Sequence, residues 1–378
     1  MKKTLVMVLA ALCVAACQQE PRKMDSPPAP EAPPAAAEQA APAAAHADTD
    51  VIGMLLKSEL ATGLDPEMAF VPEDNPVTPA KVELGRLLYF DARTSRDGTV
   101  SCATCHHPDT GWTDKGPTST GIGGQKGTRR APPSFNRLFS TLQFWDGRAA
   151  SVEEQAKGPI ENPIEHGMTH ADLEARFSKI PEYGPLFEKA FGTSEVTIDR
   201  FAKAVASFER TIISGNSPFD KWQAGDESAV SEEAKRGHQV YLAEGRCAIC
   251  HSGANFTNEQ FHNLGVGMNK EKPDLGRYEV TKAEKDKGAF KTPTLRNLSS
   301  RAPYMHDGSE PTLESVVELY NRGGNKNDHL DPLITPLNLT EQQKSDLIAF
   351  MKSLDGPSTK VDIPDVFPGG WKAGMPVE

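Results

Sequence analysis

Cysteine is scarce in this sequence. Six cysteines occur in 378 residues, and an exported protein would normally pair its cysteines as disulfides. Cys13 and Cys17 lie in or next to an N-terminal apolar segment, so the rest of the chain keeps four. All four stand in two Cys-x-x-Cys-His strings, at 102–106 and 247–251. No cysteine is left for a structural disulfide.

Basic runs and long apolar runs are also missing. The formal net charge is −11 and no cluster of Lys and Arg occurs, so nucleic acid is excluded as an expected partner. The N-terminal apolar run, from Leu5 to Ala16, is too short to span a membrane as a helix. It follows Met1-Lys2-Lys3, which is typical of a secretory signal.

The end of that signal resembles the lipobox of bacterial lipoproteins, with Val14-Ala15-Ala16 before Cys17. We therefore expect residues 1–17 to be a lipoprotein signal peptide with the lipid on Cys17. Ordinary cleavage near Ala16 is the alternative. Residues 18–50 are rich in Ala and Pro and form an expected extended tether. The predicted location is the periplasmic side of a bacterial membrane, with a lipid anchor.

The four remaining cysteines favour one chemistry over its alternatives. A Cys-x-x-Cys pair alone is also typical of a thioredoxin-like redox site or of half a zinc site. Neither site requires a histidine directly after the second cysteine, and here one occurs twice. The spacing predicts two covalently bound haem c groups, attached at Cys102 and Cys105 and at Cys247 and Cys250, with His106 and His251 as iron ligands.

The organisation of the chain predicts a mainly α fold of two tandem cytochrome c-like domains, with long loops around one haem each. The domains are expected at 51–214 and 215–355, followed by a Pro- and Gly-rich tail at 356–378. The similar segments 84–89 and 236–241 suggest an internal duplication, in which Gly85 and Gly237 mark close helix contacts.

Apolar stripes and capping patterns locate three helices. Ile198, Phe201, Ala202, Val205, Phe208 and Ile212 form one stripe, and Leu347, Ile348, Met351 and Leu354 form another. Thr340 with Gln343 has capping-box spacing at the start of the second helix. Ser151 with Glu154 predicts a short helix that stops at Gly158-Pro159.

Almost the whole chain, from about residue 77 to 354, resembles the bacterial dihaem cytochrome c peroxidase superfamily, and within it the MauG-like branch. The resemblance rests on ordered strings: Leu84-Gly85, Gln143-Phe144-Trp145-Asp146-Gly147-Arg148, Gln155-Ala156, Gly158-Pro159, Asn162-Pro163-Ile164-Glu165, Thr294-Leu295-Arg296-Asn297 and Ala302-Pro303-Tyr304-Met305-His306-Asp307-Gly308, together with both Cys-x-x-Cys-His strings.

The resemblance implies that the haem of the 51–214 domain meets peroxide. It places Glu165 there as the acid/base that moves a proton between the peroxide oxygens, with Gln155 and Pro159 shaping the pocket. It also places Trp145 between the haems as an electron relay. Taken without the surrounding motif, Glu165 is a solvated surface charge and Trp145 is ordinary core.

The residues expected opposite the two proximal histidines differ from those of many relatives. The resemblance places Ile122 where some members have a distal histidine, and isoleucine cannot bind iron, so the first haem is expected to be five-coordinate. At the second haem it places Tyr320 where many members have methionine. The stripe of its helix includes Leu313, Val316 and Val317. Core filling is the alternative for Tyr320, and Met305 and Met268 are the rival ligands.

Three further departures limit what the resemblance implies. Arg130 and Arg301 stand where members with an interdomain calcium commonly have Asn and Thr, which makes calcium doubtful because an arginine repels the cation. Gly245 stands where MauG has a surface tryptophan that passes electrons from its protein substrate. His166 is expected to be a surface residue, with tuning of the pocket as the alternative.

Together these features predict a haem peroxidase that uses hydrogen peroxide to oxidise a protein electron donor, through high-valent iron shared by two haems. A redox protein or a protein substrate is the expected partner. The alternative is a non-catalytic dihaem electron-transfer cytochrome. An open iron above Glu165 argues against this alternative, because a carrier gains nothing from an open coordination position.

Overall fold

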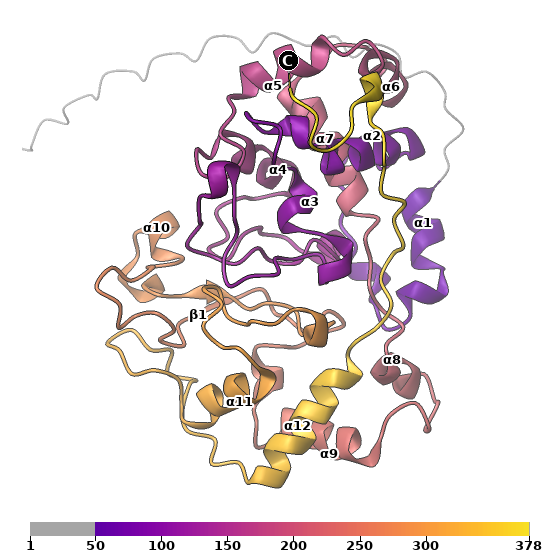
Figure 1. Ribbon diagram of the computed structural model, residues 1–378. Helices are drawn as coiled ribbons and strands as arrows, with labels where there is room; N and C mark the ends of the chain where they lie inside the picture. The colour runs from indigo at the N-terminus through magenta and orange to yellow at the C-terminus, as the bar shows by residue number, and fades with distance from the viewer. Residues whose placement is uncertain (1–49, 378) are drawn as a thin grey trace, which may run out of the picture. The chain divides into compact units, whose positions relative to one another are not determined.

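The computed structural model describes residues 50–377. The predicted signal peptide, Cys17 and nearly all of the predicted tether lie outside these residues. Most regular structure in the described part is helical (Figure 1). The α-helices are α1 (Val51–Leu56), α2 (Pro79–Phe90), α3 (Cys102–Cys105), α4 (Val152–Glu161), α5 (His170–Ser178), α6 (Tyr183–Phe191), α7 (Ile198–Glu209), α8 (Pro218–Gln223), α9 (Glu232–Leu242), α10 (Tyr278–Thr281), α11 (Leu313–Asn321) and α12 (Glu341–Ser353).

The strand content of the described residues is small, as expected. Strands β1 (Phe261–His262) and β2 (Phe290–Lys291) pair antiparallel, with Phe261 opposite Lys291. The stretch 116–133 is a long loop whose regular structure is a 3₁₀ turn at Ile122–Gly124 and one bridge between Thr120 and Lys126. No helix in the described part is long and apolar enough to cross a membrane. The prediction of a mainly α chain with long loops is confirmed.

The pairs α2–α7 and α9–α12 make the most extensive helix–helix contacts among the described residues. A Cβ on Gly85 of α2 would lie 1.9 Å from the carbonyl oxygen of Ala204 in α7, and a Cβ on Gly237 of α9 would lie 1.9 Å from that of Asp346 in α12. Each glycine therefore lets one helix backbone rest on another. The predicted close approach at both positions is confirmed.

The duplication extends beyond these glycines. Four residues after each glycine stands a tyrosine whose hydroxyl donates to the backbone carbonyl of the histidine in the haem string. Tyr89 donates to His106 at 3.1 Å, and Tyr241 donates to His251. The helix before each Cys-x-x-Cys-His string, α2 in the first half and α9 in the second, thus holds the backbone at the end of that string.

The predicted stripes form the cores of the two halves. Phe201, Ala202, Val205 and Phe208 of α7 are buried in the first core, and Leu347, Met351 and Leu354 of α12 or its C-cap are buried in the second. The capping box of α12 is also confirmed: the Thr340 side chain accepts from the Gln343 backbone N–H, and the Gln343 side chain accepts from that of Thr340.

The predicted end of α4 is wrong. The helix continues through Gly158 and Pro159 to Glu161. A proline inside a helix removes one hydrogen bond, but the loop that follows supplies donors to the last turn. The N–H of His166 bonds the Pro159 carbonyl at 3.2 Å, and that of Met168 bonds the Ile160 carbonyl at 2.9 Å.

The capping box expected at the start of α4 is only half formed. The Ser151 side chain accepts from the Glu154 N–H, but the Glu154 carboxylate bonds the N–H of Ala150 at 3.0 Å and not that of Ser151. The single cap from Ser151 is enough to satisfy one of the free N–H groups in the first turn.

The C-terminal segment returns from α12 to the first half (Figure 1, yellow). Ser358 pairs with Ser214 in an antiparallel bridge, and the Thr359 N–H bonds the Ile213 carbonyl at 2.9 Å. Further on, Phe367 and Trp371 are each 5% exposed and belong to the first core. The segment lacks α-helix, as predicted, but it is part of the packing of the first half.

Substitution of the contact glycines tests this helix packing. Gly85→Ala and Gly237→Ala are each expected to lower the free energy of unfolding by about 1–3 kcal/mol, because the new methyl group must displace a neighbouring backbone. Guanidinium denaturation followed by circular dichroism measures the change.

Gly184 in α6 is the matched control, because the nearest atom to a Cβ there, beyond its neighbours, lies at 3.7 Å. Gly184→Ala is expected to leave stability unchanged or raise it by about 0.4–1 kcal/mol. Equal losses in all three variants would show that helix contact is not the cause.

Candidate functional site

The first Cys-x-x-Cys-His string forms a one-turn helix. The spacing of three residues puts the thiols of Cys102 and Cys105 on one face of α3, and neither forms a disulfide. His106 follows at the C-cap. Its Nδ1 lies 3.2 Å from the carbonyl oxygen of Trp112, so Nδ1 donates and Nε2 keeps its lone pair. Burial lowers the pKa of His106, which favours the neutral, metal-binding form.

The second string has the same arrangement. Cys247 begins a 3₁₀ turn that leads to Cys250 and His251. Nδ1 of His251 lies 3.2 Å from the Phe256 carbonyl oxygen and 3.0 Å from that of Pro293. Both partners are acceptors, so Nδ1 carries the proton and Nε2 is free to bind a metal. Burial lowers the pKa of His251 to about 4.

A large cavity lies against the second string. It encloses about 1740 Å³ of empty space, its open mouth included, and its wall contains Cys247, Cys250 and His251. Much of the remaining wall is apolar, with Leu264, Val266, Leu295, Leu298, Leu313, Val316, Val317, Leu347 and Met351. Two thiols, a free imidazole nitrogen and an apolar surround fit a c-type haem.

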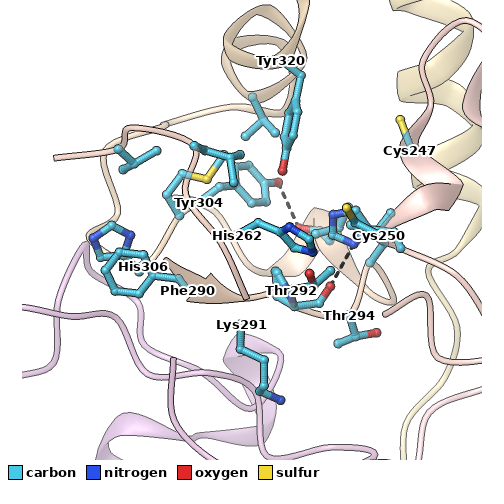
Figure 2. A pocket seen from close by; sticks show the side chains of 18 of the residues that line it. Cys247, Cys250, His262, Phe290, Lys291, Thr292, Thr294, Tyr304, His306 and Tyr320 are labelled. Atoms are coloured by element: carbon cyan, nitrogen blue, oxygen red, sulfur yellow. Dashed lines mark hydrogen bonds between the residues drawn. The ribbon is translucent and has the colours of Figure 1, made fainter. Parts of the chain in front are cut away.

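Tyr320 enters the same cavity from α11. Leu313, Val316 and Val317, the other members of the predicted stripe, line the cavity with it. Figure 2 shows the Tyr320 ring pointing into the pocket with its hydroxyl at the inner end. Burial raises the pKa of Tyr320, so its ionisation requires a cation nearby. Of the rival ligands, Met305 lines this cavity and Met268 does not.

Another cavity, of about 760 Å³, lies against the first string. It is called the first cavity, and the larger one against the second string is called the second cavity. The first cavity brings together residues that are far apart in the sequence: His106, Trp145, Gln155, Pro159 and Glu165 all line it. The residues predicted to form the peroxide pocket therefore line one and the same cavity. Ile122 does not line this cavity. Its N–H bonds the Glu165 carbonyl at 3.0 Å, and its side chain packs beside Gly167.

Glu165 is only partly exposed and is held by its own loop. Its Oε1 accepts a hydrogen bond of 2.7 Å from Nδ2 of Asn162, the C-cap residue of α4. Burial raises the pKa of Glu165, and the nearby charge of Arg148 opposes this rise. A carboxyl group with a raised pKa exchanges protons more readily near neutral pH than a solvated glutamate does.

Trp145 lies between the two cavities and lines both. Its indole N–H donates to the Arg130 carbonyl oxygen at 2.8 Å, and its ring meets the His306 ring edge-on at a centroid distance of 6.4 Å. The backbone carbonyl of Trp145 also accepts from Lys291 of β2 at 2.7 Å. These contacts fix the indole at the junction of the two halves.

Arg130 joins the halves at the same place. Its guanidinium donates to the carbonyl oxygens of Asp114 and Gly116 in the first half and, at 3.3 Å, to that of Ala302 in the second. Its backbone N–H bonds the His306 carbonyl at 2.7 Å. A fixed cation already engages these three carbonyl oxygens, which supports the expectation that calcium is doubtful here.

Two residues differ from expectation or were missed. The prediction that His166 is a surface residue is wrong: it is 3% exposed and its Nδ1 lies 3.1 Å from the Thr94 carbonyl oxygen.

Glu209 at the end of α7 was not predicted as a site residue. It lines the first cavity, and burial raises its pKa to about 8. The only sequence signal for Glu209 is its position on the buried side of an amphipathic helix.

His262 was also missed. It lines the second cavity, where Figure 2 shows it beside Cys250. Its Nδ1 lies 2.6 Å from a carboxylate oxygen of Asp331, and its Nε2 is buried without a hydrogen-bond partner. A histidine in a strand of only two residues carries no periodic signal, so nothing in the sequence distinguished it from a surface residue.

Two helical halves, each with a cavity against its own Cys-x-x-Cys-His string, define a c-type cytochrome with two haems. The model of the di-haem cytochrome c peroxidase family matches residues 79–228, and that of the cytochrome c family matches residues 234–355.

Known proteins are similar in sequence to this one over most of its length. It is 41% identical over 304 residues to methylamine utilization protein MauG of Methylorubrum extorquens, covering 80% of this chain and 85% of that one. It is 37% identical to cytochrome c551 peroxidase of Nitrosomonas europaea, covering 80% and 86%. Among solved structures, a MauG-like protein associated with microbial copper homeostasis has 31% identity and a TM-score of 0.71, covering 76% and 93%.

The chain therefore belongs to the di-haem cytochrome c peroxidase family. It is an oxidoreductase of that family with two covalently bound c-type haems.

Proposed function

We propose that this protein is a peroxidase that uses hydrogen peroxide at the first cavity to oxidise a protein electron donor. One observation carries the proposal: in the part of the chain that the structure describes, the wall of the first cavity offers no common second ligand for an iron bound by His106. Among the described residues that line it, none besides His106 is a histidine, methionine or tyrosine, the side chains other than cysteine that commonly bind haem iron. Glu165 and Gln155 line it instead.

Two haems would be held at Cys102, Cys105 and His106 and at Cys247, Cys250 and His251, and they would supply the redox chemistry for the two-electron reduction of peroxide. The chain supplies the proton transfer. Glu165 accepts the proton from one peroxide oxygen and delivers it to the other, so that this oxygen leaves as water. Asn162 holds the carboxyl group in place, and Gln155 adds a polar group to the same wall.

Tyr320 is the proposed second axial ligand of the haem at Cys247 and Cys250. Its phenol points into the cavity that contains His251, and a phenolate favours oxidised iron, whereas a thioether raises the reduction potential. This assignment makes the second haem a store for an oxidising equivalent. Trp145, which lines both cavities, is the proposed electron relay between them.

Replacement of the proposed proton carrier tests the function. Glu165→Gln is expected to slow peroxide-dependent oxidation of a reduced small c-type cytochrome by about 10²–10⁴-fold, the usual contribution of general acid–base catalysis. Because burial raises the pKa of Glu165, activity of the parent protein should fall as the pH drops through a value above the ordinary carboxyl pKa of 4.5. The variant should lack this acidic limb.

Glu161→Gln is the matched control, because Glu161 is an exposed carboxylate at the end of α4, shortly before the loop that carries Glu165. It should keep the parent rate. If the parent and Glu165→Gln react equally fast, the protein is better described as a dihaem electron carrier.

Electron paramagnetic resonance of the resting ferric protein tests the ligand. The parent is expected to show one high-spin haem and one six-coordinate haem, and Tyr320→Phe should turn the second signal into a high-spin one. Tyr304→Phe is the control, since Tyr304 lines the same cavity but donates its hydroxyl to the Leu298 carbonyl at 3.0 Å. An unchanged spectrum in Tyr320→Phe would assign the ligand elsewhere, with Met305 the first candidate.

We also propose that the chain is exported to the periplasmic side of the membrane and anchored there by lipid on Cys17. Cys17→Ser should move the protein from the membrane fraction to the soluble periplasmic fraction. Recovery of the variant in membranes would contradict the anchor.

A further inference from the structure

A line of ring side chains connects the second cavity with the protein surface. It starts at Tyr241 of α9, which lines the cavity. His238, one turn earlier in α9, stacks on Tyr241 with a centroid distance of 6.3 Å and an interplanar angle of 22°. Trp222 of α8 meets His238 edge-on at 5.5 Å. The Trp222 side chain is partly exposed, so the line ends in contact with solvent.

Two features show that these rings are more than core filling. Nδ1 of His238 is buried and has no hydrogen-bond partner, an arrangement that costs free energy and that an apolar side chain would avoid. In the first half the equivalent position, directly after Gly85, is Arg86. Its guanidinium bonds Glu83 and the Asp362 carbonyl and makes no ring contact among the described residues. The first half therefore has no ring at the position that His238 occupies in the second half.

The outer end of the line has a proton acceptor. The indole N–H of Trp222 donates to the exposed carboxylate of Glu227 at 3.0 Å. The other three tryptophans of the chain differ: Trp112 bonds a serine hydroxyl, Trp145 bonds a backbone carbonyl, and the Trp371 N–H has no partner. Only at Trp222 can loss of an electron be coupled to a proton shift onto a carboxylate.

We propose that Trp222 is a redox-active surface residue that passes electrons from a protein donor to the second haem by way of His238 and Tyr241. This inference rests on the proposed peroxidase function and names the place where the donor is oxidised. Gly245, which also lines the second cavity, has no side chain that could carry an electron from this position.

Each transfer moves one electron. Trp222 gives up an electron toward the oxidised second haem, and its N–H proton shifts to Glu227. The docked donor then returns one electron to Trp222, and the proton moves back from Glu227 to the indole nitrogen. Two such rounds match the two-electron reduction of one peroxide. The Tyr241 hydroxyl donates to the His251 carbonyl, which is not a base, so the Tyr241 ring serves as a path without losing a proton.

Freeze-quench electron paramagnetic resonance of the haem-loaded protein, mixed with peroxide without donor, tests the inference by a readout other than activity. A tryptophan radical is expected in the parent and should be lost in Trp222→Phe. Trp371→Phe is the matched control and should keep the radical, because Trp371 is buried in the first core. His238→Leu should also remove the signal while Trp222 remains.

Glu227→Gln sharpens the test without risk to the fold, because the Glu227 side chain is exposed. It should convert the radical from a deprotonated to a protonated form, which changes its hyperfine pattern. A radical that survives in Trp222→Phe, or one with the same pattern in Glu227→Gln, would overturn the inference.

Donor kinetics separate this inference from the proposed function. The Trp222→Phe variant should react with peroxide at the parent rate, and ascorbate should still reduce the oxidised variant. It should no longer oxidise a reduced small c-type cytochrome. Equal losses with both reductants, or no loss with either, would overturn the route through Trp222. A parent protein whose haem spectrum does not respond to peroxide would instead overturn the proposed peroxidase function.

Discussion

Direct contact between helix backbones at Gly85 and Gly237 is the constraint on which both halves depend. With no Cβ at these positions, α2 rests on α7 and α9 rests on α12. The tyrosine one turn later then reaches the carbonyl of the histidine in the haem string. Each haem-binding imidazole is thereby placed relative to the helix pair, and a second contact to its Nδ1 sets the tautomer.

The junction of the halves depends on charge. Arg130 supplies a permanent cation to carbonyl oxygens from both sides, and its own carbonyl holds the Trp145 indole. A guanidinium has fixed donor directions and does not dissociate. The position of the Trp145 indole is therefore fixed by the protein's own side chains and backbone. Around this point the walls of the two cavities differ: the first contains Glu165 and Gln155, and the second contains the phenol of Tyr320.

Much of this organisation could be predicted from the sequence because it rests on local spacing. The Cys-x-x-Cys-His strings, the stripe of α7, the capping box of α12 and the two contact glycines are all patterns within a few residues of each other. What could not be predicted depends on distant partners. His166 is buried because the Thr94 carbonyl faces it, and α4 passes Pro159 because a later loop supplies donors to its last turn. The contact of Trp222 with His238 joins α8 and α9, and no pattern within either helix predicts it.

The return of the C-terminal segment to the first core has a consequence for how the protein matures. Synthesis proceeds from the N-terminus, so Cys102 and Cys105 are made long before Phe367 and Trp371. The half that is made first is thus the half that is completed last. Its core stays incomplete until Phe367 and Trp371 have been made, and a shortening of the C-terminus that removes them removes part of that core.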